Sequence, residues 1–371
     1  MKIIHIITSL SEGGAQSLLN QFIKADCKNK HIVIPLLNNG RYINIIRERG
    51  IKVIPLSFNS FHNFIKSIIQ IKIILKKESP DLIHSWLYHA NLVSSFLFLF
   101  NPKLKVVWSI HNFSVSLKSI SFKTLIIVLL NSFFSYFIPK KIIFASNAAI
   151  NSHLKIKFDF RKIVLIKNGI DTEIYKPSKY KKDLKSEIGI KGKTIFAMIA
   201  RFDKAKDHIN LFEALRLLKL NNENWFLLLI GENMDQKNKE LISLINKAGI
   251  KELTQCLGIR KDICYILNGI DFLVLSSLSE DQPMILIEAM SCGKLCISTD
   301  VGSSSIIIDQ FGWIVPKSNP KELFKCLLKV MKKDQYQLQL LSKQARKHIK
   351  DNFSINNMIE DYNSLYLKIK N

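Results

Sequence analysis

The amino-acid sequence predicts an α/β protein with two doubly wound domains. The chain has 371 residues, which exceeds one ordinary domain and suits two. Short apolar runs alternate with longer helical patterns, and a second series of such runs starts near residue 194. Strands that are buried on both faces appear as continuous apolar runs, so both sheets are expected to be parallel. Hydrophobic residues make up 47% of the chain, which supports two cores and excludes a disordered protein.

Seven apolar runs of strand length fall in the first 170 residues. They are residues 2–8, 31–37, 52–56, 81–84, 105–110, 141–145 and 162–166. Helical patterns lie between them, for example at 15–26, 60–77 and 91–100. The first run is apolar but short and leads directly into Ser11-Glu12-Gly13-Gly14. We therefore interpret it as a core strand and not as a signal peptide.

After Asn168-Gly169-Ile170-Asp171 comes a polar, lysine-rich segment that runs to residue 193. It is the candidate linker, because it contains Pro177 and Gly189. Five further strands are expected at 194–200, 225–231, 255–258, 271–275 and 294–298. Three helices are expected at 320–332, 334–350 and 354–370. The predicted divisions are a domain of residues 1–170, a domain of residues 171–353 and a last segment of residues 354–371.

The charge of the chain is concentrated in its first half. The formal net charge is +24, and residues 1–170 hold 23 Lys and Arg against 6 Asp and Glu, which gives +17. Such an excess points to an acidic partner: nucleic acid, anionic lipid or a phosphorylated substrate. A lysine-rich genome composition is the alternative explanation.

Cysteine usage and apolar run lengths restrict the compartment. None of the six cysteines forms a CxxC pair, which fits a reducing, cytoplasmic setting. No run approaches the roughly 20 apolar residues of a spanning helix. The nearest is residues 124–138, within a lysine-flanked segment of residues 116–141. Two interpretations stay open for it: a buried helix, or an interfacial helix on an anionic membrane, with five possible inserting side chains. Those are Phe122, Leu125, Ile126, Phe133 and Phe134.

Gly13 and Gly14 stand between the first predicted strand and the helix that follows. Paired glycines let the backbone approach a ligand closely, and the start of a helix favours an anion. The GxGxxG fingerprint is absent, so a nicotinamide site is not indicated.

Two cations follow the first strand of the second domain. Arg201 and Lys206 lie in ARFDKAKDH, and both can point into a cleft from one turn. A pair of fixed cations suits a diphosphate, whose negative charge grows as it leaves. Ordinary surface lysines are the competing interpretation.

Two glutamates occupy the segment SSLSEDQPMILIEAMSCG. Glu280 precedes Pro283, and Glu288 comes eight residues after Glu280, close to two helical turns. Both carboxylates can therefore face one cleft and accept hydrogen bonds from sugar hydroxyls. The neighbours of Glu288 are apolar, so its charge is costly without a partner or ligand.

The chain resembles the family 4 glycosyltransferases, which have the GT-B architecture. The resemblance rests on modest motifs that occur in family order over nearly the whole chain. They are Gly13-Gly14-Ala15-Gln16, Asn168-Gly169-Ile170-Asp171, ARFDKAKDH, Gly231-Glu232, Leu257-Gly258-x3-Asp262-Ile263 and Glu280-x7-Glu288. It implies two Rossmann-like domains that face a cleft, with the C-terminal helix crossing back to the first domain.

The resemblance also implies roles for individual residues. Arg201 and Lys206 would hold the donor diphosphate, Glu280 the transferred sugar and Glu288 the nucleotide ribose. Gly13 and Gly14 would bring backbone amides to the sugar phosphate, and Gly231 would lie on the donor side. The family's reaction retains anomeric configuration and needs no metal or other cofactor, and no Asp-x-Asp pair occurs here.

His111 is a catalytic candidate, and three further residues are acceptor-side candidates. The family often has a catalytically important histidine near the position of His111, which follows the strand 105–110, and a structural histidine at a strand end is the competing interpretation. Trp86, Tyr88 and His89 line an acceptor pocket in one interpretation and pack in the core in the other. Two departures from the family pattern bear on the donor: Asp281 replaces a common glycine, and Ile306 stands where the family has an acidic residue.

The resulting prediction is a retaining glycosyltransferase of bacterial surface polysaccharide synthesis, either lipopolysaccharide O-antigen or capsule. Its partners would be a nucleotide-diphosphate sugar, with UDP favoured, a glycan or lipid-linked acceptor, and the anionic inner face of the cytoplasmic membrane. A nucleotide-sugar 2-epimerase of similar shape is an alternative enzyme. A basic nucleic-acid-binding protein is an alternative from another class, although no recognised motif supports it. The intact site residues argue against an inactive homologue that only binds.

Overall fold

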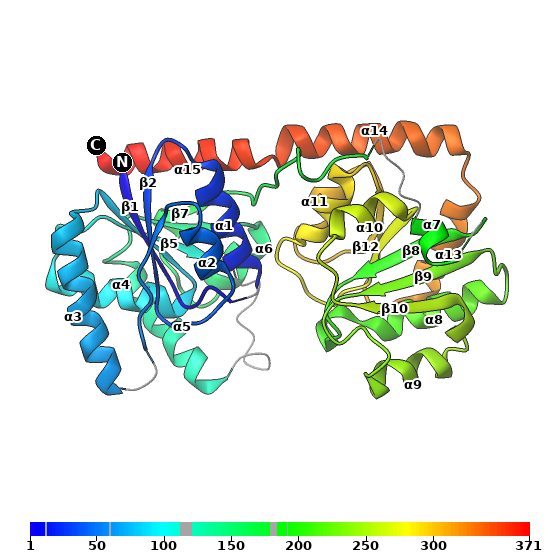
Figure 1. The fold of residues 1–371 in the computed structure, drawn as a ribbon, viewed down its shortest axis with the longest axis horizontal. Helices are drawn as coiled ribbons and strands as arrows, with labels where there is room; N and C mark the ends of the chain where they lie inside the picture. The colour runs from blue at the N-terminus through cyan, green and yellow to red at the C-terminus, as the bar shows by residue number, and fades with distance from the viewer. Residues whose placement is uncertain (12, 59–60, 112–120, 179–183, 191) are drawn as a thin grey trace. The chain divides into compact units, whose positions relative to one another are not determined.

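The computed structural model describes residues 1–371 except 12, 59–60, 112–120, 179–183 and 191. Contacts divide the chain into two compact units (Figure 1). Unit 1 comprises Met1–Gly169 and Ile355–Asn371, and unit 2 comprises Ile170–Ser354. Each unit is a doubly wound α/β domain around one parallel sheet, which confirms the predicted fold class.

The sheet of unit 1 has seven strands in the order β3-β2-β1-β4-β5-β6-β7. They are β1 Lys2–Ile7, β2 Lys30–Pro35, β3 Lys52–Val53, β4 Leu82–Trp86, β5 Val106–Ile110, β6 Lys141–Phe144 and β7 Ile163–Leu165. All pairs are parallel, with Ile3 opposite both His31 and Leu82. The order reverses between β1 and β4, and such a switch point leaves a crevice at the carboxyl ends of the strands.

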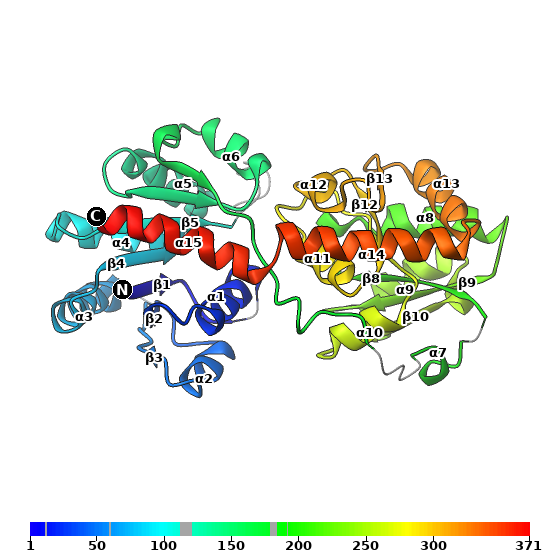
Figure 2. The same cartoon turned by 90° about the horizontal axis from the view of Figure 1, so that it is seen from above.

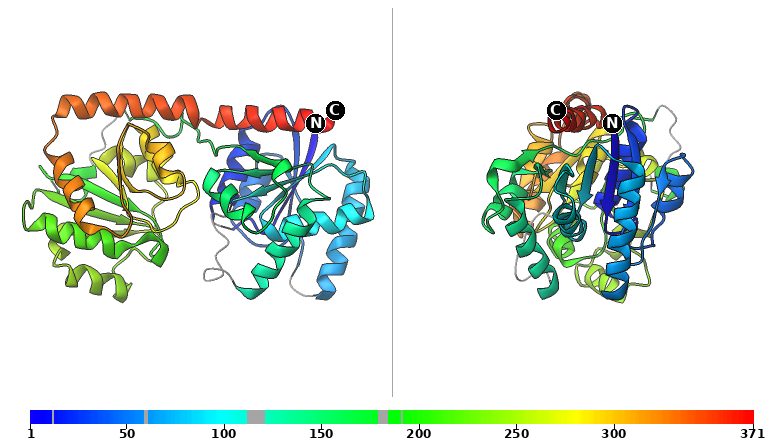
Figure 3. Two further views of the ribbon diagram at one scale, coloured as in Figure 1. Left: turned by 180° about the vertical axis from the view of Figure 1, so that it is seen from behind. Right: turned by 90° about the vertical axis from the view of Figure 1, so that its left-hand side faces the viewer.

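Helices cover both faces of the unit 1 sheet (Figures 1 and 3). One face carries α1 Gly14–Ala25, α2 Tyr42–Arg47 and α15 Ile355–Lys370. The other carries α3 Phe61–Glu78, α4 Tyr88–Phe100, α5 Phe122–Ser135 and α6 Asn147–Leu154. The short helix η1 Phe160–Lys162 leads into β7. Within unit 1, α15 lies across the sheet beside α1 (Figure 2), and the Tyr362 ring is 4.9 Å from that of Phe22. The prediction that the C-terminal helix packs on the first domain is confirmed.

The sheet of unit 2 has six parallel strands in the order β10-β9-β8-β11-β12-β13. They are β8 Thr194–Ile199, β9 Trp225–Ile230, β10 Thr254–Gly258, β11 Phe272–Leu275, β12 Leu295–Thr299 and β13 Trp313–Val315. The four middle strands β9, β8, β11 and β12 are almost wholly buried. Their continuous apolar runs are what a parallel sheet covered on both faces requires.

Unit 2 has helical elements on both faces as well. They are α7 Leu184–Glu187, η2 Lys204–Lys206, α8 His208–Lys219, α9 Lys239–Lys247, η3 Lys251–Leu253, α10 Ile263–Gly269, α11 Met284–Ser291, α12 Ser304–Ile308, α13 Pro320–Met331 and α14 Gln335–Asn352. α8 packs against α9 and α13, and α11 packs against α10, α12 and α14. One apolar core joins these helices to the sheet.

Three sequence expectations differ from the structure. β13 was not predicted, because it has three residues and two of them are half-buried. β3 comprises only Lys52–Val53 and is shorter than predicted, although the Ile54 and Leu56 amides still donate to carbonyls of β2. The candidate linker contains α7, and Leu184 is buried in the core of unit 2, so this segment belongs to that unit. None of the helices in the described part of the chain is long and apolar enough to cross a membrane.

Candidate functional site

The predicted donor residues of unit 2 lie in loops at the carboxyl edge of its sheet. The loop after β8 carries Arg201 and Lys206, and the loop after β11 carries Glu280. The Leu278 amide donates to the Ala205 carbonyl at 2.8 Å, and the Ser276 hydroxyl donates to the Lys206 carbonyl at 3.0 Å. These bonds hold the two loops together, at the edge where parallel sheets bind ligands.

Lys206 and Glu280 form a close ion pair. Lys206 Nζ lies 2.6 Å from Glu280 Oε1, and the Ser277 hydroxyl donates to the same oxygen at 2.6 Å. Both side chains are largely buried, with exposed fractions of 19% and 13%. An ammonium group has three donors, so Lys206 can bond Glu280 and still donate to a phosphate oxygen. The sequence predicted both residues but not their contact, which places a cation and a carboxylate acceptor side by side.

Arg201 precedes Lys206 in the same loop and is positioned by Asp203. The Arg201 Nε atom lies 3.3 Å from Asp203 Oδ2, and its side chain is 61% exposed. Asp203 also accepts from the Ala205 amide at 2.8 Å, so the same carboxylate fixes the turn and orients the guanidinium. That hydrogen bond and the Arg201 charge lower the pKa of Asp203, so it stays ionised. Arg201 therefore remains free on its outer side for an anionic ligand.

Glu288 lies in α11 among apolar residues of the sequence. Leu286, Ile287 and Ala289 are fully buried, and Glu288 itself is half-buried. This burial raises the pKa of the Glu288 carboxyl to about 7. A carboxyl group with such a pKa changes charge near neutral pH, a property that concentrates at functional sites.

Two glycines allow the loops of unit 2 to approach each other. Gly231 follows β9 with φ +140°, and a Cβ atom there would collide with the Ala200 carbonyl next to Arg201. Gly302 follows β12 with φ +56°, and a Cβ atom there would collide with the carbonyls of Glu280 and Asp281. Gly302 therefore lets the β12 loop pack under the Glu280 turn, a contact that the sequence did not reveal.

In unit 1 the glycine pair begins α1. Gly13 is the N-cap residue and α1 starts at Gly14, without a side-chain cap and without an acidic residue in the first turn. The first amides of a helix have no partner within the helix. This end of α1 can thus present backbone donors to an anion, as the sequence led us to expect.

His111 lies at the end of β5 and stacks on Trp86. The ring centroids are 5.2 Å apart and the planes differ by 8°. Burial lowers the pKa of His111 to about 4, so the ring is neutral near pH 7. Its Nε2 atom is buried and has no hydrogen-bond partner among the described residues. A neutral imidazole with an unused nitrogen can accept or donate one hydrogen bond to a substrate.

The other three acceptor-side candidates have different surroundings. Trp86 is fully buried, and Tyr88 is buried with its hydroxyl 2.6 Å from His153 Nε2. For these two side chains the burial favours the core-packing interpretation, because each has its polar atom bonded to another buried residue. His89 is exposed in the first turn of α4.

A buried chain of polar side chains, which the sequence did not reveal, lies behind His111. Trp86 Nε1 donates to His5 Nδ1 at 3.1 Å, and His5 Nε2 lies 2.9 Å from His31 Nδ1. His31 Nε2 lies 3.3 Å from Asp26 Oδ2. An indole N–H can only donate, so His5 must donate from Nε2, and His31 then carries its proton on Nε2 toward Asp26. The available signal was a histidine within each of the apolar runs of β1 and β2.

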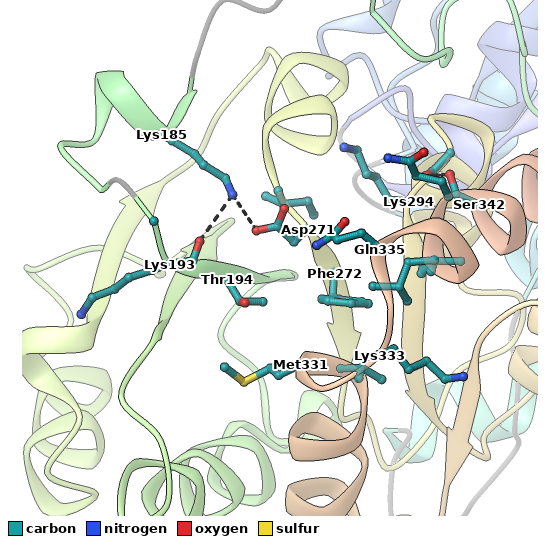
Figure 4. Close-up of a pocket in the computed structure, with 17 residues that line it drawn as sticks. Lys185, Lys193, Thr194, Asp271, Phe272, Lys294, Met331, Lys333, Gln335 and Ser342 are labelled. Atoms are coloured by element: carbon teal, nitrogen blue, oxygen red, sulfur yellow. Dashed lines mark hydrogen bonds and ion pairs between the residues drawn. The ribbon is translucent and has the colours of Figure 1, made fainter.

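A pocket of about 380 Å³ opens elsewhere in unit 2, at the amino ends of β8, β11 and β12 (Figure 4). Lys185 bonds Asp271 there at 2.8 Å, and the pocket contains none of the predicted site residues. It lies at the edge of the sheet opposite to Lys206 and Glu280. Among the described residues, no group of three or more His, Cys, Asp or Glu side chains could hold a metal ion.

Comparison with protein families assigns the chain. The family described as Glycosyltransferase Family 4 matches residues 13–174, and the family described as Glycosyl transferases group 1 matches residues 181–348. The chain belongs to glycosyltransferase family 4. Together the two matches contain every site residue named above in both units.

Curated relatives of this glycosyltransferase act in bacterial glycan synthesis. The UDP-Gal:alpha-D-GlcNAc-diphosphoundecaprenol alpha-1,3-galactosyltransferase of Escherichia coli is 27% identical over 81% of this chain and 79% of the relative. The N,N'-diacetylbacillosaminyl-diphospho-undecaprenol alpha-1,3-N-acetylgalactosaminyltransferase of Campylobacter jejuni is 25% identical over 94% of both chains. A capsular polysaccharide biosynthesis glycosyltransferase of Staphylococcus aureus is 24% identical over 84% of both.

Solved structures show the fold of this glycosyltransferase to be GT-B. Anabaena HepE in complex with UDP has a TM-score of 0.88 at 18% identity, over 99% of this chain and 100% of HepE. The lipopolysaccharide outer core galactosyltransferase WaaB has a TM-score of 0.74 at 18% identity, over 99% and 100%. The expected architecture is thereby confirmed.

Proposed function

We propose that this glycosyltransferase moves a sugar from a UDP-linked donor to a lipid-linked glycan acceptor, with retention of anomeric configuration and without a metal ion. The observation that carries the proposal is the Lys206–Glu280 pair at 2.6 Å, with Arg201 in the same loop. It sets two cations and a sugar-binding carboxylate at one edge of the sheet. A sugar attached to a diphosphate needs cations for its phosphate oxygens and an acceptor for its hydroxyl groups, and these three side chains offer both.

Arg201 and Lys206 are assigned to the diphosphate. Negative charge accumulates on the leaving diphosphate as the bond to the sugar breaks, and fixed cations stabilise that charge. Arg201 is held by Asp203 and Lys206 by Glu280, so little reorganisation is needed in the reaction. These two cations would do the work of the metal ion in metal-dependent enzymes.

The two glutamates are assigned to hydroxyl groups of the donor. Glu280 would bind the transferred sugar, with Ser277 holding the carboxylate in place. Glu288 would bind the nucleotide ribose. An ionised carboxylate is a better acceptor for a ribose hydroxyl than a neutral carboxyl group. Because the pKa of Glu288 is about 7, nucleotide affinity should rise as the pH rises through 7.

The acceptor side is assigned to unit 1. His111 would bond the acceptor or the transferred sugar through its buried Nε2, and the amides after Gly13 and Gly14 would contact the sugar phosphate. His89 is the exposed acceptor-side candidate that remains. Trp86 and Tyr88 are not assigned to the acceptor, because both side chains are buried.

The comparisons support the choice of donor and acceptor. HepE has been solved in complex with UDP and with UDP-glucose, and the names of two relatives specify diphosphoundecaprenol-linked acceptors. We therefore propose that the enzyme works at the cytoplasmic face of the membrane, in the synthesis of lipopolysaccharide O-antigen or capsule. The excess of 17 positive charges in residues 1–170 suits an anionic membrane surface.

The test is a set of single substitutions assayed with a panel of UDP-sugars. Arg201→Ala and Lys206→Ala should each lower turnover at least about 100-fold, the usual loss of one group that stabilises transition-state charge. Glu280→Ala should lower turnover as well, because the transferred sugar loses a hydrogen-bond acceptor. Arg216→Ala is the matched control, because Arg216 pairs with Glu213 on the surface of the same unit. All four variants should stay folded. Full activity in the three site variants refutes the site assignment.

Product analysis tests the reaction type. Proton NMR of the product should show the anomeric configuration of the donor, and a chelator should leave the rate unchanged. Inverted product would contradict retention, and a rate lost to chelator and restored by a divalent cation would contradict the metal-independent site. Release of an epimerised sugar without acceptor would assign the site to a 2-epimerase.

A further inference from the structure

Helix α5 exposes its large apolar side chains and buries its small polar ones. Asn131, Ser132 and Ser135 are buried, and Val128 is the one large apolar side chain of α5 that is fully buried. Six apolar side chains recur every three or four residues along α5 and its end, and therefore share one face. They are Phe122, Ile126, Leu129, Leu130, Phe133 and Phe137, with exposed fractions from 38% to 75%. A helix that faces water has the opposite arrangement.

The exposed face, which we call the α5 apolar face, ends in a cluster of aromatic rings. The Phe133 and Phe137 centroids are 5.6 Å apart, and Tyr136 lies 6.4 Å from Phe137. On the sheet side Phe134 packs against Phe96 at 6.4 Å, so the cluster is attached to the core of unit 1. The residues of the sequence-predicted membrane contact thus divide: Phe122, Ile126 and Phe133 are exposed, whereas Leu125 and Phe134 are half-buried. Residues 116–120 of that contact lie outside the described residues.

Positive charge flanks the α5 apolar face at both ends. Lys123 is exposed in the first turn, and Lys140 is exposed beyond the last turn. Lys162 donates to the Tyr136 carbonyl at 2.7 Å, so its ammonium also lies at the end of α5. Residues 82–158 contain eight lysines and no Asp or Glu. A surface of this kind attracts anions and repels other cationic surfaces.

We propose that the α5 apolar face docks unit 1 on an anionic lipid bilayer, with the aromatic rings inserted and the lysines at the headgroups. The inference rests on the proposed function in that a lipid-linked acceptor requires the enzyme at a membrane. Lysine stems lie along apolar surface while their ammonium groups stay in water, which suits both zones of the lipid interface. Inserted apolar area and paired basic charge act together in such interfacial helices.

A second copy of the chain is the competing occupant of this face. In a twofold dimer the same patch meets itself, so the lysines at the ends of α5 would lie close to those of the partner copy. Like charges in close contact oppose association. The charge pattern therefore favours the anionic bilayer.

The test is flotation of the full-length protein with vesicles at low salt. Vesicles of equimolar phosphatidylglycerol and phosphatidylcholine should carry the protein upward, and vesicles of phosphatidylcholine alone should carry far less. Phe133→Ser combined with Phe137→Ser should weaken binding at least about tenfold, since two inserted rings are lost. Lys140→Gln should weaken it about fivefold, the equivalent of one basic residue at an anionic surface.

Leu220→Ser combined with Tyr336→Ser is the matched control, because these side chains are 75% and 74% exposed in unit 2. It should float like the wild type. Flotation independent of phosphatidylglycerol, or unchanged in the double phenylalanine variant, overturns the proposal. A dimer that this variant dissociates, with no vesicle binding by the wild type, assigns the face to a second copy.

Two further measurements separate this inference from the proposed reaction. Arg201→Ala should still float although it is inactive, because Arg201 lies in unit 2 and not on the α5 apolar face. The double phenylalanine variant should retain the slow hydrolysis of a UDP-sugar, which needs no membrane. Loss of flotation in Arg201→Ala would contradict the assignment of docking to α5.

Discussion

Glu288→Gln is expected to stabilise unit 2 at alkaline pH and to have little effect at acidic pH. Burial raises the pKa of this carboxyl from 4.5 to about 7, while the unfolded chain keeps the ordinary value. At about 1.4 kcal/mol per pH unit, the difference corresponds to about 3 kcal/mol.

The sign follows from the protons that each state binds. Below pH 4.5 the carboxyl is neutral in both states and costs nothing. Between pH 4.5 and 7 the folded state holds the proton that the unfolded state has lost, so stability falls as the pH rises. Above pH 7 the full cost is present. Glutamine has nearly the same shape and no charge, so it avoids this cost.

The distribution of cysteines provides an assay for unit 2 alone. Cys292, Cys296 and Cys326 are buried in unit 2, whereas Cys27 of unit 1 is exposed. Urea titrations with pulse labelling of the buried thiols, read by peptide mass spectrometry, should show the variant up to about 3 kcal/mol more stable near pH 8.5. Near pH 5 the two proteins should differ by less than about 1 kcal/mol.

Glu240→Gln is the control, since Glu240 is exposed on α9 and its carboxylate stays hydrated in both states. Equal effects of Glu288→Gln at both pH values, or a loss of stability that is larger at pH 8.5 than at pH 5, would refute the reasoning. In that case the Glu288 carboxylate has a partner that compensates its burial.

Three other outcomes are expected. Gly231→Ala should destabilise unit 2 by more than about 1 kcal/mol in the same thiol assay, because its Cβ atom meets the Ala200 carbonyl at a positive φ. Tyr366→Phe should cost about 1–3 kcal/mol in urea unfolding followed by tryptophan fluorescence, since it removes the partner 2.7 Å from His84 Nδ1. A pH profile of kcat/KM should show no ionisation of His111 between about pH 6 and 8, because burial keeps its pKa at about 4. An ionisation in that range that disappears in His111→Asn would contradict this expectation.

Much of the fold was predictable because both sheets are parallel and buried on two faces. Such strands are apolar along their length, so runs such as the one that becomes β9 stand out. β13 did not, since it has only three residues and two of them are partly exposed. The identities of Arg201, Lys206 and Glu280 were also predictable from motifs, whereas the contact between Lys206 and Glu280 depends on how two distant loops pack.

Buried polar partners were not predictable. Trp86 and Tyr88 look like pocket residues by type, but each satisfies its polar atom within the core, with His5 and His153. The orientation of α5 was equally undetermined, because the helix is apolar on several sides and its sequence does not tell which side meets the sheet. The structure decides this through the burial of Asn131, whose amide donates to the Tyr88 carbonyl at 3.0 Å.

The attachment of α15 to unit 1 has a consequence for synthesis on the ribosome. Unit 2 is continuous from Ile170 to Ser354, so it can fold as soon as that stretch has emerged. Most of unit 1 is translated first, yet the face of its sheet that carries α1 and α2 stays partly uncovered, and His84 lacks Tyr366, until α15 is made. The earlier-made domain is therefore the later to finish folding, and in the interval it exposes apolar surface on which chaperones can act.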